Sequence, residues 1–224
     1  GRTYKRNARM QSFTANQIAN YGTSIGAHSF DVMVGHETYS FIYNYDYTHK
    51  YKFYTLGNPE FSNAITMADM NSYTNEHSME SYFCRLNYDY NDKYYLSASL
   101  RTDSSSKFHP DHRRGTFWSV GGAWLINKES WFDASWVQEL KLKASIGSQG
   151  NDNIGDFLYT DRFNIINSNN SLGTSFKSKG TKDITWETNT NFNIGAEFQL
   201  WNRVTGSIEY YRRCLLYTSP SPRD

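Results

Sequence analysis

The sequence predicts an all-β protein whose strands form an antiparallel up-and-down meander, part of a transmembrane β-barrel. Three observations predict this class. Apolar and polar residues alternate over segments of about ten residues. Short and long connections alternate along the chain between these segments. Aromatic residues are abundant, with 18 Tyr, 14 Phe and 6 Trp among 224 residues, and they crowd the segment ends. We expect about eight or nine strands by this pattern.

The alternation is clearest in three segments. In Glu139–Ile146, the sequence ELKLKASI places its apolar residues on one face and Lys141 and Lys143 on the other. The same pattern runs through Tyr94–Arg101 and Asn191–Leu200. Because successive strand side chains point to opposite faces, each segment predicts a strand with one apolar and one polar face. Further candidate strands are Met10–Asn20, Ser29–Tyr45, Ser81–Asp89, Gly115–Ile126, Phe157–Phe163 and Val204–Tyr211.

The connections between these segments come in two lengths. Membrane barrels have short periplasmic turns and longer extracellular loops, so the alternation of lengths favours a barrel. An intermediate link, Ile126–Glu139, should contain a short helical turn near Lys128–Val137. The tight turns are Tyr21–His28, Asn91–Lys93 and Trp201–Arg203, and the long loops are Thr48–Met79, Asp103–Arg114 and Gly147–Thr185.

Composition narrows the class further. The mean hydropathy is −0.73, and no apolar run approaches the roughly 20 residues of a spanning helix. A barrel strand is apolar on one face only, so a polar average is compatible with it. The net charge of +1 gives no electrostatic footprint for nucleic acid. Cys84 and Cys214 are too few for a disulfide framework and form no CxxC pair.

A soluble alternative stays open on pattern alone. A secreted β-sandwich that binds carbohydrate through loop aromatics would also show alternating strands. It would bury its apolar residues in one closed core between two packed sheets, whereas a barrel carries them on the outside of a single sheet.

Nothing in the sequence predicts an enzyme, a cofactor or a metal centre. His109 and His112 flank a proline that prevents helical pairing, which indicates a surface loop. Glu76 and Glu80 are acidic, but no feature places them across a sugar as in a glycosidase. We therefore expect no catalytic, cofactor-binding or metal-binding residues, and the sequence does not identify substrate-binding residues.

Several phrases resemble the SusC/RagA family of TonB-linked (TonB-dependent) outer-membrane transporters. The segment Glu80–Phe132 is similar to the family's succession of a strand, an Asn-Asp-Lys turn, a strand ending in Arg-x-Asp-(Gly/Ser)-Ser-Ser, and a Trp-Gly-x-Phe-x-Ser-Val strand. It departs from the family at Arg114, where Trp is frequent, and at Cys84, where Gly is usual. Trp136–Gly155 resembles the family's LKLRASYGxxGN segment, and Ile184–Arg213 its LxWExTxxxNIG segment. Val34–Ser40 resembles a strand start of the family.

The resemblance implies a plugged barrel of about 22 strands in the outer membrane of a Gram-negative, Bacteroidetes-type bacterium. It also implies the TonB complex and a SusD-like surface lipoprotein as partners, and oligosaccharide or peptide cargo. Aromatic residues of the first long loop could stack on sugars or simply pack the loop: Tyr47, Tyr51, Phe53 and Tyr54. The polar residues expected to face the lumen are Arg85, Asn87, Arg101, Lys141, Lys143, Asn193, Glu197 and Glu209.

The chain is expected to be a piece of such a barrel. Residues 1–213 are assigned to the barrel domain, and the plug domain and signal peptide are expected to be absent. Residues 214–224, with the sequence CLLYTSPSPRD, resemble a translated sequencing adapter, and their two prolines disfavour a central strand. We therefore expect this segment to be a non-native tail.

Overall fold

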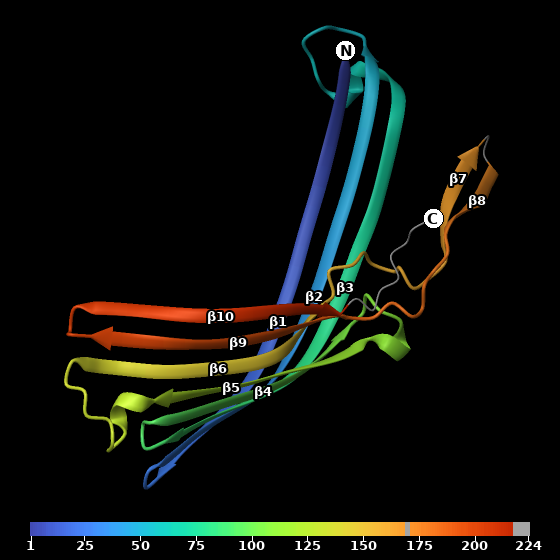
Figure 1. The fold of residues 1–224 in the computed structure, drawn as a ribbon. Helices are drawn as coiled ribbons and strands as arrows, with labels where there is room; N and C mark the ends of the chain where they lie inside the picture. The colour runs from blue at the N-terminus through green and yellow to red at the C-terminus, as the bar shows by residue number, and fades with distance from the viewer. Residues whose placement is uncertain (169–170, 217–224) are drawn as a thin grey trace. The chain divides into compact units, whose positions relative to one another are not determined.

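The computed structural model describes residues 1–168 and 171–216, and strands dominate these residues (Figure 1). Short 3-10 turns occur at η1 (Phe61–Asn63), η2 (Pro110–His112) and η3 (Ile126–Lys128). Within the described part of the chain, no helix has the length and apolar character needed to cross a membrane. The strands are β1 (Arg2–Ile25), β2 (His28–Phe53), β3 (Ala64–Tyr90), β4 (Tyr94–Ser105), β5 (Arg114–Leu125), β6 (Val137–Asn151), β7 (Arg162–Ser168), β8 (Ser171–Ser178), β9 (Glu187–Leu200) and β10 (Val204–Leu216).

Eight of these strands form one sheet in the order β1-β2-β3-β4-β5-β6-β9-β10, which confirms the predicted meander. From β3 onwards each neighbouring pair in the sheet is antiparallel. The remaining two strands, β7 and β8, form a separate antiparallel hairpin inserted between β6 and β9. The β-sandwich alternative required two packed sheets, and the single eight-stranded sheet does not support it.

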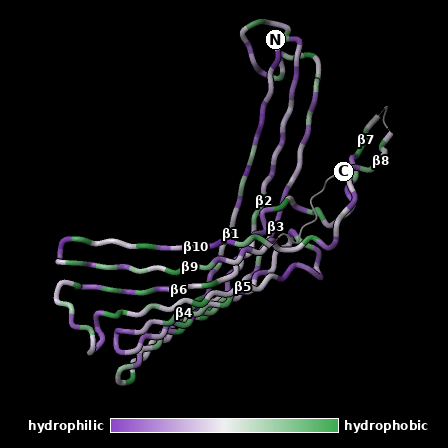
Figure 2. Tube along the Cα trace, in the orientation of Figure 1, coloured by the Kyte–Doolittle hydropathy of each residue, from purple (hydrophilic) through white to green (hydrophobic). Residues whose placement is uncertain are grey.

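The chain divides into two compact units. One unit comprises residues 1–14 and 39–78, and the other comprises residues 15–38 and 79–224. Strands β1, β2 and β3 are long enough to contribute to both, whereas β4 to β10 belong to the second unit alone. Along the strands of the second unit, hydrophobic and hydrophilic residues alternate (Figure 2).

The tight turns follow the predictions closely. The turns Asn91–Lys93 and Trp201–Arg203 separate the strands at the predicted residues. Both begin with two residues of positive φ, 55° and 52° in the first and 51° and 51° in the second. Two successive residues with positive φ give a turn whose twist matches that of the flanking strands. The predicted turn Tyr21–His28 is shorter in the structure, where only Gly26 and Ala27 separate β1 from β2.

The predicted long loop Thr48–Met79 is wrong, because most of it is strand. β2 extends to Phe53 and β3 begins at Ala64. The N-terminal part of β3 was not predicted as a strand, because it has polar side chains on both faces and therefore no continuous apolar face. Cross-strand pairs hold the two strands together instead, including the Tyr47 hydroxyl donating to Asp69 at 2.6 Å.

Two smaller predictions are displaced along the chain. Residues 157–161 are not part of a strand, and the strand in this region, β7, begins only at Arg162. The predicted loop 147–185 therefore contains the end of β6 and a hairpin. The helical turn expected near Lys128–Val137 is present as η3, which begins two residues earlier and ends at Lys128.

Candidate functional site: the polar face of the sheet

Strand register gathers polar side chains from five strands onto one face of the second unit, here called the polar face. One row across the sheet joins Asn87, Ser97, Gly121, Ser145 and Asn193, each paired with the next. Because alternate residues of a strand share a face, the rows two residues away carry side chains on the same side. The polar face is therefore a direct product of the period-2 alternation read from the sequence.

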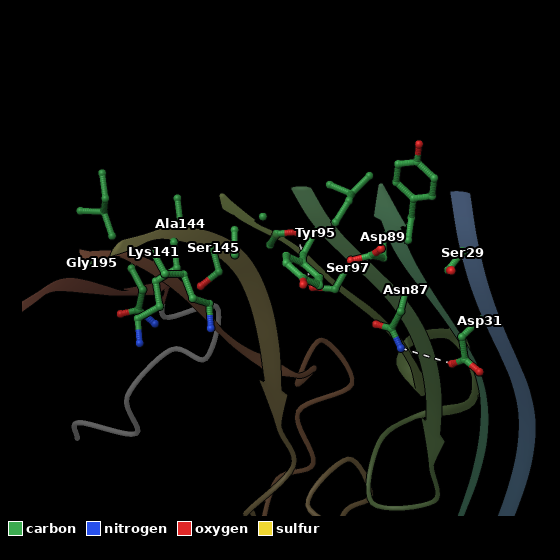
Figure 3. A pocket seen from close by; sticks show the side chains of 18 of the residues that line it. Ser29, Asp31, Asn87, Asp89, Tyr95, Ser97, Lys141, Ala144, Ser145 and Gly195 are labelled. Carbon is green, nitrogen blue, oxygen red and sulfur yellow. Dashed lines mark hydrogen bonds between the residues drawn. The ribbon is translucent and has the colours of Figure 1, made fainter. Parts of the chain in front are cut away.

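A hollow of 570 Å³ lies against this face. Figure 3 shows Asn87 and Asp31 at one end, joined by a hydrogen bond of 3.3 Å, and Lys141 and Ser145 towards the other. Five of the eight residues predicted to face a barrel lumen line it: Asn87, Lys141, Lys143, Asn193 and Glu209. The structure thus brings these five together, although they come from four strands.

Four charged residues form a continuous network beside the hollow. Glu197 accepts hydrogen bonds from Lys141 at 3.1 Å and from Lys143 at 2.6 Å. Lys143 also donates to Glu209 on β10, so the network crosses three strands. Two cations and two anions alternate within it. Their side chains are 32–50% exposed, so the network matches a hydrated surface and not a dry core.

Gly195 allows this network to cross the sheet. It lies on β9 between Lys143 of β6 and Glu209 of β10. A Cβ atom there would meet the Ile208 carbonyl oxygen at 2.9 Å, the Glu209 Cγ at 3.0 Å and the Lys143 Cε at 3.3 Å. The missing side chain leaves room for the Lys143 stem to reach over β9, so a glycine in the middle of a strand has a specific packing role.

A second hollow, of 470 Å³, continues along the polar face. Ser97, Ser119 and Ser145 contribute small side chains to its lining, and Gly121 and Gly147 contribute none. The Ser119 hydroxyl is 2.7 Å from that of Ser99. Amide side chains from β6 and β9 also line it, followed by residues of β10: Gln149, Asn191, Asn193, Tyr211, Arg212 and Arg213.

The two remaining polar-face arginines lie further along the sheet. Arg85 and Arg101 line a third hollow of 560 Å³. Arg101 donates to Glu37 at 3.0 Å and to Asp103 at 2.6 Å, and its guanidinium lies 5.3 Å from the centre of the Phe83 ring. Arg101 is therefore held by contacts with its own strand and with β2 and β3.

The opposite face of the same strands is apolar and open to the surroundings. Leu142 is 41% exposed and Ile194 is 50% exposed, and both lie in regular strands. Exposed apolar area on this scale marks an interaction surface in a protein. Other members of this apolar face with more than a third of their surface exposed are Leu96, Leu100, Trp118, Val120, Ile146, Phe192, Ile208 and Tyr210.

Glu129 links the turn after β5 to the neighbouring strand ends. This carboxylate accepts hydrogen bonds from the Tyr94 hydroxyl at 2.5 Å and the Trp124 indole N–H at 3.0 Å, and it pairs with Lys93 at 3.4 Å. The Tyr94 hydrogen bond, followed by those of Trp124 and Lys93, holds the pKa of Glu129 below its usual value. The turn is therefore tied to the neighbouring turn at Asn91–Lys93.

At the other end of β5 an aromatic cluster anchors the long loops. Phe108 is fully buried and packs with Trp186, and Phe117 meets the same indole edge-on. The Trp186 indole N–H donates to the Arg113 carbonyl at 2.8 Å. Since buried aromatic pairs of this kind add stability beyond their burial, they fix the loop at 106–113 and the segment before β9 to each other.

The loop candidates from the sequence have ordinary structural partners. His109 accepts from the Asp111 backbone N–H at the start of η2, and His112 lies 3.9 Å from Asp183. Glu80 accepts from Tyr82 at 2.9 Å and lies 3.1 Å from His36. Among the described residues, no group of three His, Cys, Asp or Glu side chains could hold a metal ion.

In the first unit, the predicted loop aromatics lie mostly on strand β2. Tyr43 and Tyr45 both pack against Tyr73 of β3, with ring centres 6.1 Å and 5.1 Å away. Tyr47 belongs to the same alternating set and bonds Asp69. The hydrogen bond to Asp69 holds Tyr47 in the sheet, and Tyr54 alone of the four predicted residues lies beyond β2.

Comparison with known proteins identifies the family. The model of the family described as "TonB dependent receptor-like, beta-barrel" matches residues 1–214. TonB-dependent receptor SusC of Bacteroides thetaiotaomicron is 32% identical over 209 residues, which are 88% of this chain and 20% of that protein. TonB-dependent receptor P39 of Formosa agariphila is 34% identical over 157 residues, 66% of this chain and 15% of that protein.

The fold comparison agrees. A structure described as the RagAB peptide transporter superposes with a TM-score of 0.88 at 27% sequence identity, covering 94% of this chain and 24% of that one. A second, the RagAB peptide importer in an open-open state, superposes with a TM-score of 0.87 at the same identity, covering 95% and 24%. The chain spans about a fifth of the length of the curated relatives it matches. The chain belongs to the family of TonB-dependent receptor-like β-barrels.

Proposed function

We propose that these residues form part of the wall of a TonB-dependent importer that carries glycans or peptides across the outer membrane of a Gram-negative bacterium. The observation that carries the proposal is the two-faced single sheet. Its apolar face suits lipid, and its polar face, with the charged network of Lys141, Lys143, Glu197 and Glu209, suits a hydrated lumen.

Membership of the family supports the partners that we propose. The parent protein would receive energy from the TonB complex and would work with a SusD-like surface lipoprotein. The isolated chain would not transport, because eight strands with open edges do not close a barrel.

A second, smaller proposal concerns residues 214–224. We assign residues 214–224 to a non-native, adapter-like tail, although β10 pairs with β9 as far as Leu216. The family match ends at residue 214. Sequencing the genomic locus tests this assignment, and source DNA that encodes the same eleven residues would contradict it.

Uptake measurements test the transport proposal. Cells of the source bacterium would be given labelled oligosaccharides and labelled oligopeptides, before and after deletion of the parent gene or of TonB. We expect uptake of one cargo class to disappear in both deletions and to return when the parent gene is restored. Undiminished uptake of both classes in the gene deletion would contradict the proposal.

A further inference from the structure

A row of carboxamide side chains follows strand β9 on the polar face. Asn189, Asn191 and Asn193 occupy alternate positions of the strand and therefore share its face. Gln149 lies opposite Asn189 on β6 and accepts a hydrogen bond of 3.4 Å from Asn191. These four residues are here called the amide row. Three of them line the second hollow: Gln149, Asn191 and Asn193.

The hydrogen-bonding capacity of the amide row is largely unused. Asn189 is only 5% exposed, yet among the described residues its side-chain oxygen meets no hydrogen-bond donor. Buried polar atoms are nearly always paired, so an orphaned one indicates a missing partner. A carboxamide offers two donors and an acceptor, and the long Asn191–Gln149 contact occupies little of the capacity of these two residues.

The spacing of the row matches an extended polypeptide. Alternate residues of a strand are about 6.8 Å apart, which is twice the rise per residue. An extended peptide presents the N–H and C=O of every second residue along one edge, with the same repeat. Asn191 and Asn193, the two asparagines of the row that line the hollow, could therefore each donate to a main-chain carbonyl and accept from a main-chain N–H of one chain lying along β9.

The floor beside the row leaves space for such a chain. Gly121 and Gly147 carry no side chains, and a Cβ at Gly147 would lie 2.8 Å from the Ser119 Cβ. On the β5–β6 side of the row, Ser119 and Ser145 are small, whereas Tyr211 and Arg213 of β10 border Asn193 and Asn191 on the other side. Since main-chain recognition does not depend on the cargo's side chains, this arrangement suits peptides of varied sequence.

We propose that the amide row binds the main chain of a cargo peptide in extended conformation, with Asn191 and Asn193 as its principal contacts. This inference rests on the proposed transport function and specifies its cargo class as peptide. Binding can be measured without energy from TonB, so a failure here and a failure of transport are separate results.

The test uses the full-length parent protein purified in detergent. It is incubated with a randomised decapeptide mixture and, separately, with a mixture of cello-, malto- and xylo-oligosaccharides, and retained molecules are identified by mass spectrometry. We expect peptides to be retained. Asn191→Leu and Asn193→Leu should each weaken binding of a retained peptide by about three- to tenfold, the range for one or two lost hydrogen bonds.

Gln199→Leu is the matched control, because Gln199 lies on the same face of β9 outside the row. It should bind like the unmodified protein. A second arm replaces single peptide amides by esters, which removes one N–H donor at a time. At the position over Asn191, the ester should weaken binding to the unmodified protein about threefold and to Asn191→Leu much less.

Four outcomes would overturn the proposal. Retention of oligosaccharides alone would assign another cargo class. Equal binding by Asn191→Leu, Asn193→Leu and Gln199→Leu would remove the row from recognition. An ester penalty that is the same in every variant would exclude main-chain contact at Asn191. Loss of folding stability in the asparagine variants with unchanged peptide affinity would show that another segment of the parent protein occupies the row.

Discussion

Arginine substitution at two adjacent positions of β6 distinguishes the environments of the two faces of the sheet. Ala144 and Ser145 are both small and both exposed, and they point to opposite faces. Ala144 lies in a row with Gly122 and Ile194 on the apolar face, whereas Ser145 lies on the polar face. Because neither change removes a large side chain, the comparison isolates the cost of placing a guanidinium in each environment.

The size of the effect follows from the depth of Ala144. On β6 the apolar run comprises Leu140, Leu142, Ala144 and Ile146, so Ala144 is within one position of its middle. Arginine on the lipid face costs about 2–4 kcal/mol at the bilayer midplane and about 0–1 kcal/mol near the interfaces. We expect Ala144→Arg to lower the free energy of unfolding by about 2–3 kcal/mol, and Ser145→Arg by less than about 0.5 kcal/mol.

The assay is chemical unfolding of the full-length parent protein refolded into phospholipid vesicles, followed by tryptophan fluorescence. Association of each variant with the vesicles is checked separately, so that poor insertion is not mistaken for a loss of stability. Equal losses of stability in the two variants, or a larger loss for Ser145→Arg, would refute the assignment of the apolar face to lipid.

Two further predictions concern single contacts. The lowered pKa of Glu129 means that its carboxylate stabilises the fold above the unfolded-state pKa, and that this contribution disappears as the pH falls through the folded-state pKa. The stability advantage of the unmodified protein over Glu129→Gln should therefore shrink on acidification, measured by unfolding at a series of pH values, and an advantage independent of pH would contradict the assignment. Gly195→Val should cost about 1–3 kcal/mol of stability because its side chain meets the Ile208 carbonyl and the Lys143 stem. Gly173→Val on β8, where an added Cβ meets nothing within 4 Å, is the control, and equal effects of the two changes would argue against the packing role of Gly195.

The strands of the second unit were largely predictable. Their period-2 pattern places Lys141 and Lys143 opposite Leu140 and Leu142, because one face of each strand must be apolar and the other polar. The eight polar residues expected to share a face do so. The extended parts of β2 and β3 were not predicted, because a strand with polar groups on both faces has the composition of a loop.

The amide row and the role of Gly195 were beyond sequence reasoning. The alternation of residues 191–200 places Asn191 and Asn193 on the polar side of a strand, but it does not include Asn189 or Gln149. Their significance depends on the register between β6 and β9, which are separated along the chain by the β7–β8 hairpin. A reader of the sequence could have noticed the asparagines at alternate positions of β9, though not the glutamine that lies opposite them.

The sequence by itself determined the class of protein: alternating apolar and polar residues make a sheet with two unlike faces, and its motifs match one transporter family. Only the tertiary structure decided which residues meet across strands. Alternation specifies the face on which a side chain lies, but register specifies its neighbours, and register is set by turns and pairing between distant segments. The charged network, the glycine that lets it cross β9 and the amide row all depend on that second kind of information.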